Sequence, residues 1–157
     1  MSPPLALLNR EAIDEFIESE VKLIITIDLG TSDHEDIAYA EGNGINVIVT
    51  DHHIPHDTLP KAYALVNPKI GNTYPEPMLC GAGVMFKLTQ AFLKKYGEYF
   101  NVKKGWEKWL LDMVGIATLS DMVPLRGENR VFASYGLKVL RKSPRVGLKK
   151  LLSSLKI

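Results

Sequence analysis

Two apolar runs of this chain end in side chains that can bind a metal ion. The run VKLIITI is followed by Asp28, and the run INVIVT is followed by Asp51, His52 and His53. Imidazole and carboxylate groups together suit a divalent transition metal such as Mn²⁺, while the lack of thiolates argues against structural zinc. A lone aspartate at a strand end is more often a turn former, so Asp28 alone is ambiguous. Adjacent imidazoles gain little from packing, and we therefore predict that His52 is a metal ligand.

Three further places on the chain carry candidate site residues. Asp121 follows a very apolar helical segment, and an acid at a helix C-terminus is disfavoured by the dipole, which favours a role in a site. Arg130 could hold a phosphate with a bidentate fork. Gly81 and Gly83 begin a predicted helix whose backbone N–H groups could bind an anion, although close helix packing explains small residues equally well.

Alternating strands and helices are expected to position these groups. The predicted strands span residues 21–28, 45–50 and 62–67, and the predicted helices between and before them span 9–20 and 32–41. Asn9 is a predicted N-cap, and Ser32 and Glu35 form a predicted capping box. The continuous apolar run of the first strand predicts that it is covered on both faces. Short connections predict a parallel sheet in an α/β fold, which places Asp28 and Asp51 on the same rim.

The second half of the chain changes to helical patterns. We predict helices over 81–97, 106–122, 128–140 and 146–155, with Trp106 and Trp109 assigned to packing. From residue 131 onward there is no acid, and the seven basic residues are Lys138, Arg141, Lys142, Arg145, Lys149, Lys150 and Lys156. Arg141, Lys142 and Arg145 are candidate DNA contacts, although such a run is more often a solvated helix face.

Length and composition limit the class of protein. The 157 residues, 46% hydrophobic and 24% charged, fit one globular domain, with 1–8 an untethered end, 9–70 an α/β part and 81–157 a helical part. Cys80 is the only cysteine, which excludes an intrachain disulfide and favours a reducing compartment. No apolar stretch reaches the roughly 18 residues of a membrane span. We therefore expect a cytoplasmic protein without a membrane partner.

Five segments carry a resemblance to a known family. In this order and spacing, ITIDLG, VIVTDHH, LVNPK, GAGVMFKL and SDMVPLRGENR resemble the DHH phosphoesterase superfamily, and within it the RecJ-type exonucleases. The similarity runs from Asn9 to the end of the chain. It implies a Rossmann-like parallel sheet flanked by helices, a helical second half, and 5′→3′ hydrolysis of single-stranded DNA in repair and recombination. The implied cofactor is Mn²⁺ or Mg²⁺, with two ions in a complete site.

The resemblance also implies a role for each matching residue. Asp28 resembles the acid that bridges the two ions, and His52 and Asp121 resemble ligands of one of them. Asp51 is similar to a group that orients the histidines, and His53 to the histidine that faces the substrate phosphate. Phosphodiester hydrolysis at such a site relies on the ions to activate water and to stabilise charge on the phosphate.

The chain departs from the family pattern before Asp28. The family places an acid-rich DxD-type motif on an earlier strand, whereas the acids that precede Asp28 here fall in a predicted helix. The family's C-terminal domain is also missing. We therefore expect part of a DHH domain with at most one well-liganded ion, little or no exonuclease activity from these 157 residues, and an uncovered sheet edge that invites self-association.

Two other functions fit the same residues. One is hydrolysis of oligonucleotides, cyclic dinucleotides or pyrophosphate within the same superfamily. The other is a DHH fold that has lost its metals and serves as a non-catalytic binding scaffold. The presence of Asp28, His52, His53 and Asp121 argues against that second alternative, because a decayed site has no reason to keep four costly polar groups.

Overall fold

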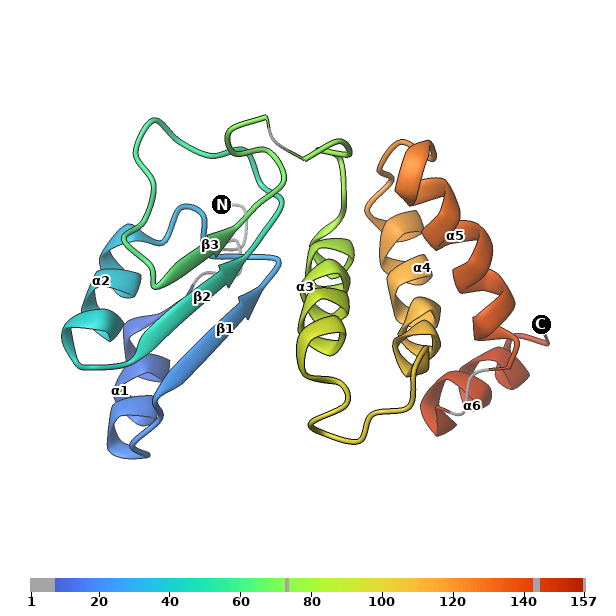
Figure 1. Ribbon diagram of the computed structural model, residues 1–157, viewed down its shortest axis with the longest axis horizontal. Helices are drawn as coiled ribbons and strands as arrows, with labels where there is room; N and C mark the ends of the chain where they lie inside the picture. The colour runs from blue at the N-terminus through green and yellow to red at the C-terminus, as the bar shows by residue number, and fades with distance from the viewer. Residues whose placement is uncertain (1–7, 73, 143–144, 157) are drawn as a thin grey trace. The chain divides into compact units, whose positions relative to one another are not determined.

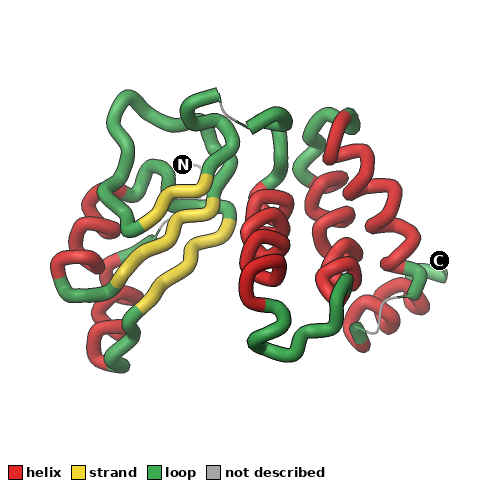
Figure 2. The backbone as a smooth tube through the Cα atoms, viewed as in Figure 1, coloured by secondary structure: helices red, strands yellow, loops and turns green. Residues whose placement is uncertain are grey.

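The computed structural model describes residues 8–72, 74–142 and 145–156 and divides the chain into two compact units. The first unit covers residues 1–85 and the second covers 86–157, and each is described here by itself. The expected untethered end lies outside the described residues except for Leu8. Figures 1 and 2 show the α/β character of the first unit and the helical character of the second.

The first unit is built on a parallel sheet of three strands in the order β1-β2-β3. The strands are β1 (Leu23–Ile27), β2 (Asn46–Thr50) and β3 (Ala64–Val66), and the helices are α1 (Arg10–Glu18) and α2 (His34–Gly42). The registers pair Ile27 with Thr50 and Thr50 with Val66, so the three strands end at one rim. The parallel α/β arrangement expected from the sequence is confirmed.

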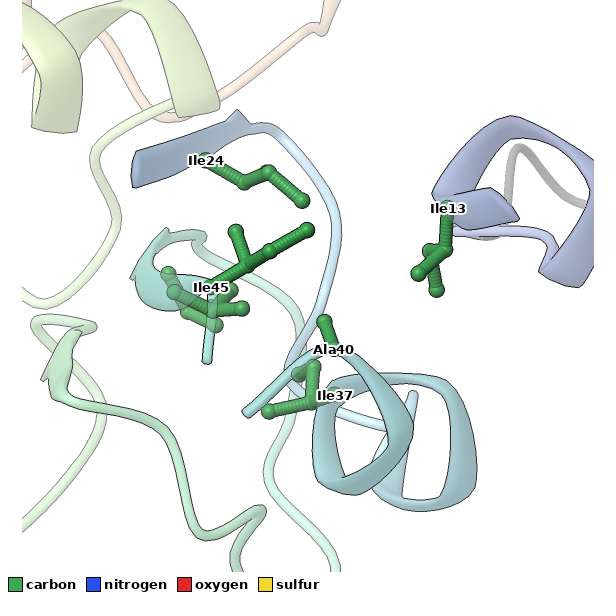
Figure 3. Packing of buried hydrophobic residues seen from close by; sticks show 7 residues of the cluster. Ile13, Ile24, Ile37, Ala40 and Ile45 are labelled. Atoms are coloured by element: carbon green, nitrogen blue, oxygen red, sulfur yellow. The ribbon is translucent and has the colours of Figure 1, made fainter. Parts of the chain in front are cut away.

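One face of this sheet carries the core of the unit. Ile13 of α1 and Ile37 of α2 pack with Ile24 of β1 and with Val47 and Val49 of β2, as Figure 3 shows in part. Both helices therefore cover the same face of the sheet. Burial of these β-branched and aliphatic side chains is the main source of stability in the unit.

The prediction that the first strand is covered on both faces is wrong. Leu23, Ile25 and Ile27 keep 42–47% of their surface exposed, while Ile24 and Thr26 between them are buried. The reason is that α1 and α2 both pack on the face that holds Ile24. Strand β1 is also an edge of the described sheet, and self-association through that edge stays a prediction.

The two predicted helix caps have opposite outcomes. Asn9 caps α1 as expected, since its side-chain oxygen accepts a hydrogen bond from the backbone N–H of Ala12 at 2.8 Å. The predicted capping box at Ser32 is wrong, because α2 begins one residue later with Asp33 as its N-cap. Asp33 makes no side-chain cap bond and instead accepts the backbone N–H of Leu8 at 2.9 Å.

The second unit consists of helices. Helix α3 (Gly81–Tyr96) crosses the boundary between the units and is followed by the 3-10 helix η1 (Trp106–Leu110), α4 (Leu111–Ser120), α5 (Gly127–Leu140) and α6 (Val146–Ser154). Gly115 of α4 and Gly136 of α5 face each other so closely that a Cβ on either would meet the other's backbone. Lys87 of α3 pairs with Glu128 of α5 at 2.7 Å.

The single helix predicted over 106–122 is two elements. Residues 106–110 form η1, and α4 ends at Ser120. Within this segment, four large apolar side chains are partly exposed: Trp106, Trp109, Met113 and Leu119. Within the described part of the chain, no helix has both the length and the apolar character needed to cross a bilayer.

Candidate metal centre

The backbone at the end of β1 turns sharply and directs Asp28 outward. The Asp28 amide donates to the carbonyl of Thr50 at 2.9 Å, which continues the pairing of β1 with β2. Asp28 then adopts φ 68°, a left-handed conformation that few residues other than glycine, asparagine and aspartate enter without cost. Gly30 follows with φ 113°, and a Cβ there would meet Thr26 and Val49. This tight turn fixes the Asp28 carboxylate at the rim.

His52 and His53 reach the same point of the rim from β2. His52 Nε2 lies 3.0 Å from Asp28 Oδ1, with the imidazole 12% and the carboxylate 56% exposed. One ligand atom from each of Asp28, His52 and His53 can be chosen so that all lie within 4.8 Å of one another. The two imidazole rings are tilted by 59° with centroids 4.7 Å apart. The strand-end residues expected to share a rim are therefore brought together.

Asp51 is the buried anchor beneath these histidines. Its Oδ1 accepts the backbone N–H of His52 at 2.7 Å and lies 2.7 Å from His53 Nδ1. Its Oδ2 accepts the backbone N–H of Thr31 at 2.9 Å. Because an ionised carboxylate only accepts, His53 Nδ1 carries the proton in this contact, and Nε2 is the ring nitrogen that faces outward.

The hydrogen bonds around Asp51 keep it ionised. Burial acts to raise the pKa of the Asp51 carboxyl. Bonds from the Thr31 side chain and amide, the His53 ring and the His52 amide outweigh that effect and lower the pKa from 3.8 to about 2. A permanently charged Asp51 therefore holds the His53 ring in a fixed orientation throughout the neutral range.

Two residues that were not predicted from the sequence support this anchor. Asn67 Nδ2 donates to Thr31 Oγ1 at 3.1 Å and to the His53 carbonyl at 2.9 Å, and both Asn67 and Thr31 are buried. Asn67 directly follows β3, so the rule that polar residues gather at strand ends could have found it. Thr31 lies in an irregular loop and carries no comparable signal.

Gly81 has a different role from the one its position suggested. A Cβ added to Gly81 would overlap the Asp28 side chain, including its Oδ1. The start of α3 therefore needs glycine because the Asp28 carboxylate lies against it. A phosphate contact by Gly81 and Gly83 is untested and stays a prediction.

The remaining site residues from the sequence lie in the second unit. Asp121 is the C-cap of α4, and its amide donates to Ala117 O at 2.9 Å. Arg130 is an exposed residue of α5. Lys142 and Arg145 line a common cavity with two tryptophans, and Arg141 is the C-cap of α5. Because each unit is described by itself, the positions of these residues relative to Asp28 are not defined.

The residues at the rim fit a divalent ion. Two ligand atoms each about 2.1 Å from an ion, at the right angle of octahedral coordination, lie about 3 Å apart. The 3.0 Å separation of His52 Nε2 and Asp28 Oδ1 matches that spacing. The carboxylate bound to His53 Nδ1 is also the usual partner of a metal-ligating imidazole. Oxygen and nitrogen donors without thiolate suit Mn²⁺ or Mg²⁺.

Comparison with known proteins agrees with this geometry. The profile of the DHH family, N-terminal domain, matches residues 4–118. The chain belongs to the DHH family. It is 41% identical over 145 residues to the single-stranded-DNA-specific exonuclease RecJ of Bacillus subtilis, covering 92% of this chain and 17% of that protein. It is 39% identical over 152 residues to RecJ of Escherichia coli, covering 92% and 26%.

Two solved structures of RecJ share the fold of this DHH chain. One is exonuclease RecJ bound to manganese, with a TM-score of 0.81 and 31% identity over 94% of this chain and 36% of the other. The second is RecJ from Thermus thermophilus in complex with Mn²⁺, with a TM-score of 0.79 and 32% identity over 92% and 21%. The DHH chain therefore spans about a quarter or less of the B. subtilis and E. coli relatives.

Proposed function

We propose that this chain supplies part of the catalytic domain of a divalent-metal-dependent exonuclease that hydrolyses single-stranded DNA from its 5′ end. The observation that carries the proposal is the convergence of Asp28, His52 and His53 at one rim, with the buried Asp51 holding the His53 ring. Similarity to RecJ proteins over most of the chain supports the choice of substrate. A role in DNA repair and recombination is part of the same proposal.

Each rim residue has a distinct part in the proposed reaction. Asp28 and His52 hold the ion at the rim, and the resemblance to the family adds Asp121 as a proposed ligand. Asp51 accepts the Nδ1 proton of His53 and so orients the ring, and Nε2 can donate to a phosphate oxygen of the DNA when the ring carries a proton on both nitrogens. Arg130 is proposed as a second phosphate contact, since its guanidinium can bind two oxygens of one phosphate.

A bound Mn²⁺ or Mg²⁺ would supply activated water and would stabilise negative charge on the phosphate. Among the described residues, the cluster of candidate ligands is limited to Asp28, His52 and His53. We therefore propose that these 157 residues bind one ion well. Hydrolysis that needs two ions would be slow or undetectable with this polypeptide alone.

Two alternatives remain as proposals with weaker support. Hydrolysis of short oligonucleotides or cyclic dinucleotides would use the same rim, but the named relatives are exonucleases specific for single-stranded DNA. A metal-free scaffold is disfavoured because Asp28, His52 and His53 converge at one rim, and such a cluster of polar groups is costly to keep without a ligand. Titration with Mn²⁺ separates the scaffold from the enzyme.

A chimera gives the sharpest test of the proposed activity. The 157 residues would replace the matching part of B. subtilis RecJ, and hydrolysis of 5′-labelled single-stranded DNA would be measured with Mn²⁺. We expect digestion of single strands in preference to duplex, at least 100-fold slower when the chimera carries His52→Ala. The unmodified 157-residue polypeptide, assayed alongside, is expected to digest little or none.

Three results would overturn parts of this proposal. A folded chimera that cleaves a cyclic dinucleotide but not single-stranded DNA would contradict the substrate. Equal activity with and without His52→Ala would contradict the site. Processive, His52-dependent digestion by the 157-residue polypeptide alone would contradict the statement that one ion is bound well and two are needed.

A further inference from the structure

The second unit presents both tryptophans of the chain on one short helix. Trp106 and Trp109 lie three residues apart in η1, and the sequence holds no other tryptophan. A 3-10 helix has three residues per turn, so side chains at i and i+3 lie one above the other on the same face. The two indoles are 49% and 45% exposed, which is unusual for the largest apolar side chains.

These indoles border a cavity that also carries positive charge. The cavity has a volume of about 500 Å³ and is lined by Trp106, Trp109, Leu110, Asp112, Lys142 and Arg145, all within the second unit. That volume lies in the range of small-molecule sites. We call this feature the indole pocket. None of the residues at the metal rim contributes to it.

A buried carboxylate fixes one of the cations in the wall of the indole pocket. Arg145 Nε donates to Asp112 Oδ2 at 2.9 Å, and Asp112 is completely buried. Asp112 Oδ1 also accepts the backbone N–H of Met113 at 2.7 Å. This ion pair orders the Arg145 side chain at the cavity, whereas Lys142 is an exposed residue on its border.

Indoles and cations around one cavity match the chemistry of a single nucleic-acid strand. Exposed bases stack on aromatic faces, and the phosphates that link them bind lysine and arginine. A duplex offers no such contact, because its bases are already stacked on one another. The segment from residue 131 onward, which contains Lys142 and Arg145, has no acid. Asp112, the acid in the lining of the cavity, is buried and paired with Arg145.

We propose that the indole pocket binds single-stranded DNA, with bases stacked on Trp106 and Trp109 and a phosphate held by Lys142 and Arg145. The choice of DNA rests on the proposed function, whereas the site itself is independent of the metal rim. It gives the exonuclease a contact with its substrate on the second unit.

Tryptophan fluorescence tests this proposal directly, because both tryptophans of the chain line the indole pocket. The full chain would be titrated with a dT oligomer in EDTA, where hydrolysis is blocked. We expect saturable quenching by the oligomer and at least tenfold weaker quenching by a duplex of equal length. Trp106→Phe and Trp109→Phe would each leave one reporter, and Trp109→Ala is expected to weaken binding about tenfold or more, as loss of a stacked base does.

The charge contribution needs a separate variant. Lys142→Ala removes an exposed side chain and is not expected to affect folding. It should lower affinity several-fold and reduce the slope of log affinity against log salt by about 0.7. The matched controls are Lys61→Ala, an exposed lysine of the first unit, and Tyr63→Ala, an aromatic residue of the first unit that is 69% exposed. Both should bind as the wild type does.

Several outcomes would overturn the indole pocket as a DNA site. Absence of quenching, or wild-type affinity in folded Trp109→Ala and Lys142→Ala, would contradict it. Equal affinity for inorganic polyphosphate and dT would contradict base stacking. A blue shift that grows with protein concentration without DNA would show that a second copy covers the pocket. His52→Ala should keep wild-type quenching, so failure of the metal site and failure of the pocket are distinguishable.

Discussion

Asp51 and its neighbours show how single residues shape the rim. Asp51 holds the ring of His53 at 2.7 Å, while His52 lies against Asp28 at 3.0 Å. The two adjacent histidines therefore have different partners. A histidine whose Nδ1 is bound to a buried carboxylate has a fixed ring orientation, which is what a phosphate contact or a metal ligand requires.

The low pKa of Asp51 makes the stability of the fold depend on pH. Because the folded-state pKa of about 2 lies below the ordinary 3.8, ionised Asp51 stabilises the fold above about pH 4. That contribution is lost as pH falls from about 4 to 2. We expect Asp51→Asn to be less stable than the wild type at pH 6, with a difference that shrinks between pH 4 and 2. Urea unfolding followed by circular dichroism measures it, and a difference independent of pH would contradict this account.

Gly81 offers a second prediction at the residue scale. The Cβ of Gly81→Ala would force the Asp28 carboxylate to move, so we expect Mn²⁺ affinity to fall at least tenfold. Because a single Cβ in the first turn of a helix is otherwise tolerated, the folded fraction should change little. Calorimetric titration measures the affinity. Gly42→Ala is the matched control, since a Cβ there meets nothing within 4 Å; equal affinity in Gly81→Ala and the wild type would refute the argument.

The residue scale also shows what sequence reasoning could achieve. Because the carboxyl ends of parallel strands lie at one edge of the sheet, the sequence correctly predicted that Asp28, Asp51 and His52 share a rim. It could not show that Gly81 makes room for Asp28, because α3 lies far along the chain. Nor could it show which imidazole Asp51 holds, because that depends on the backbone turn after β2.

At the scale of elements, the order of strands and helices follows from the sequence, whereas details of helix type do not. Apolar runs rich in β-branched residues predicted the first two strands, and a shorter apolar run over 62–67 predicted the third. Alternating exposure along β1 was missed because two helices share one face of the sheet. The 3-10 geometry of η1 was missed because an i, i+3 pair of tryptophans fits an α-helix equally well.

The crossing of α4 and α5 gives a prediction at this scale. Gly115 and Gly136 allow the two backbones to touch, so a methyl group on either would push the helices apart. Alanine gains about 1 kcal/mol in helix propensity, but forced separation costs about 1–3 kcal/mol or more. We expect Gly115→Ala to lower the free energy of unfolding, as measured by urea denaturation.

The matched control for that crossing is Gly147→Ala in α6. A Cβ at Gly147 meets nothing within 4 Å, so only the propensity gain remains. This variant should be as stable as the wild type or up to about 1 kcal/mol more stable. If Gly115→Ala behaved as Gly147→Ala does, the close contact of α4 with α5 would be contradicted.

At the scale of the whole molecule, the two proposed ligands that the structure brings together, Asp28 and His52, lie in the first unit. Asp121 stays a proposed ligand on the strength of the resemblance to the family. The chain spans about a quarter or less of the B. subtilis and E. coli relatives. We therefore propose the complete activity only for a polypeptide that also contains the remaining parts of those relatives. Binding of one ion is the part of that activity that these 157 residues are proposed to carry by themselves.

Calorimetric titration of the chain with Mn²⁺ tests the central claim most directly. We predict one ion per chain, with affinity at least tenfold lower in Asp28→Asn, His52→Ala and Asp121→Asn. Lys61→Ala, an exposed residue away from the rim strands, should bind as the wild type does. Wild-type affinity in folded His52→Ala and Asp28→Asn would contradict the metal site at the rim, and with it the proposed phosphodiester hydrolysis.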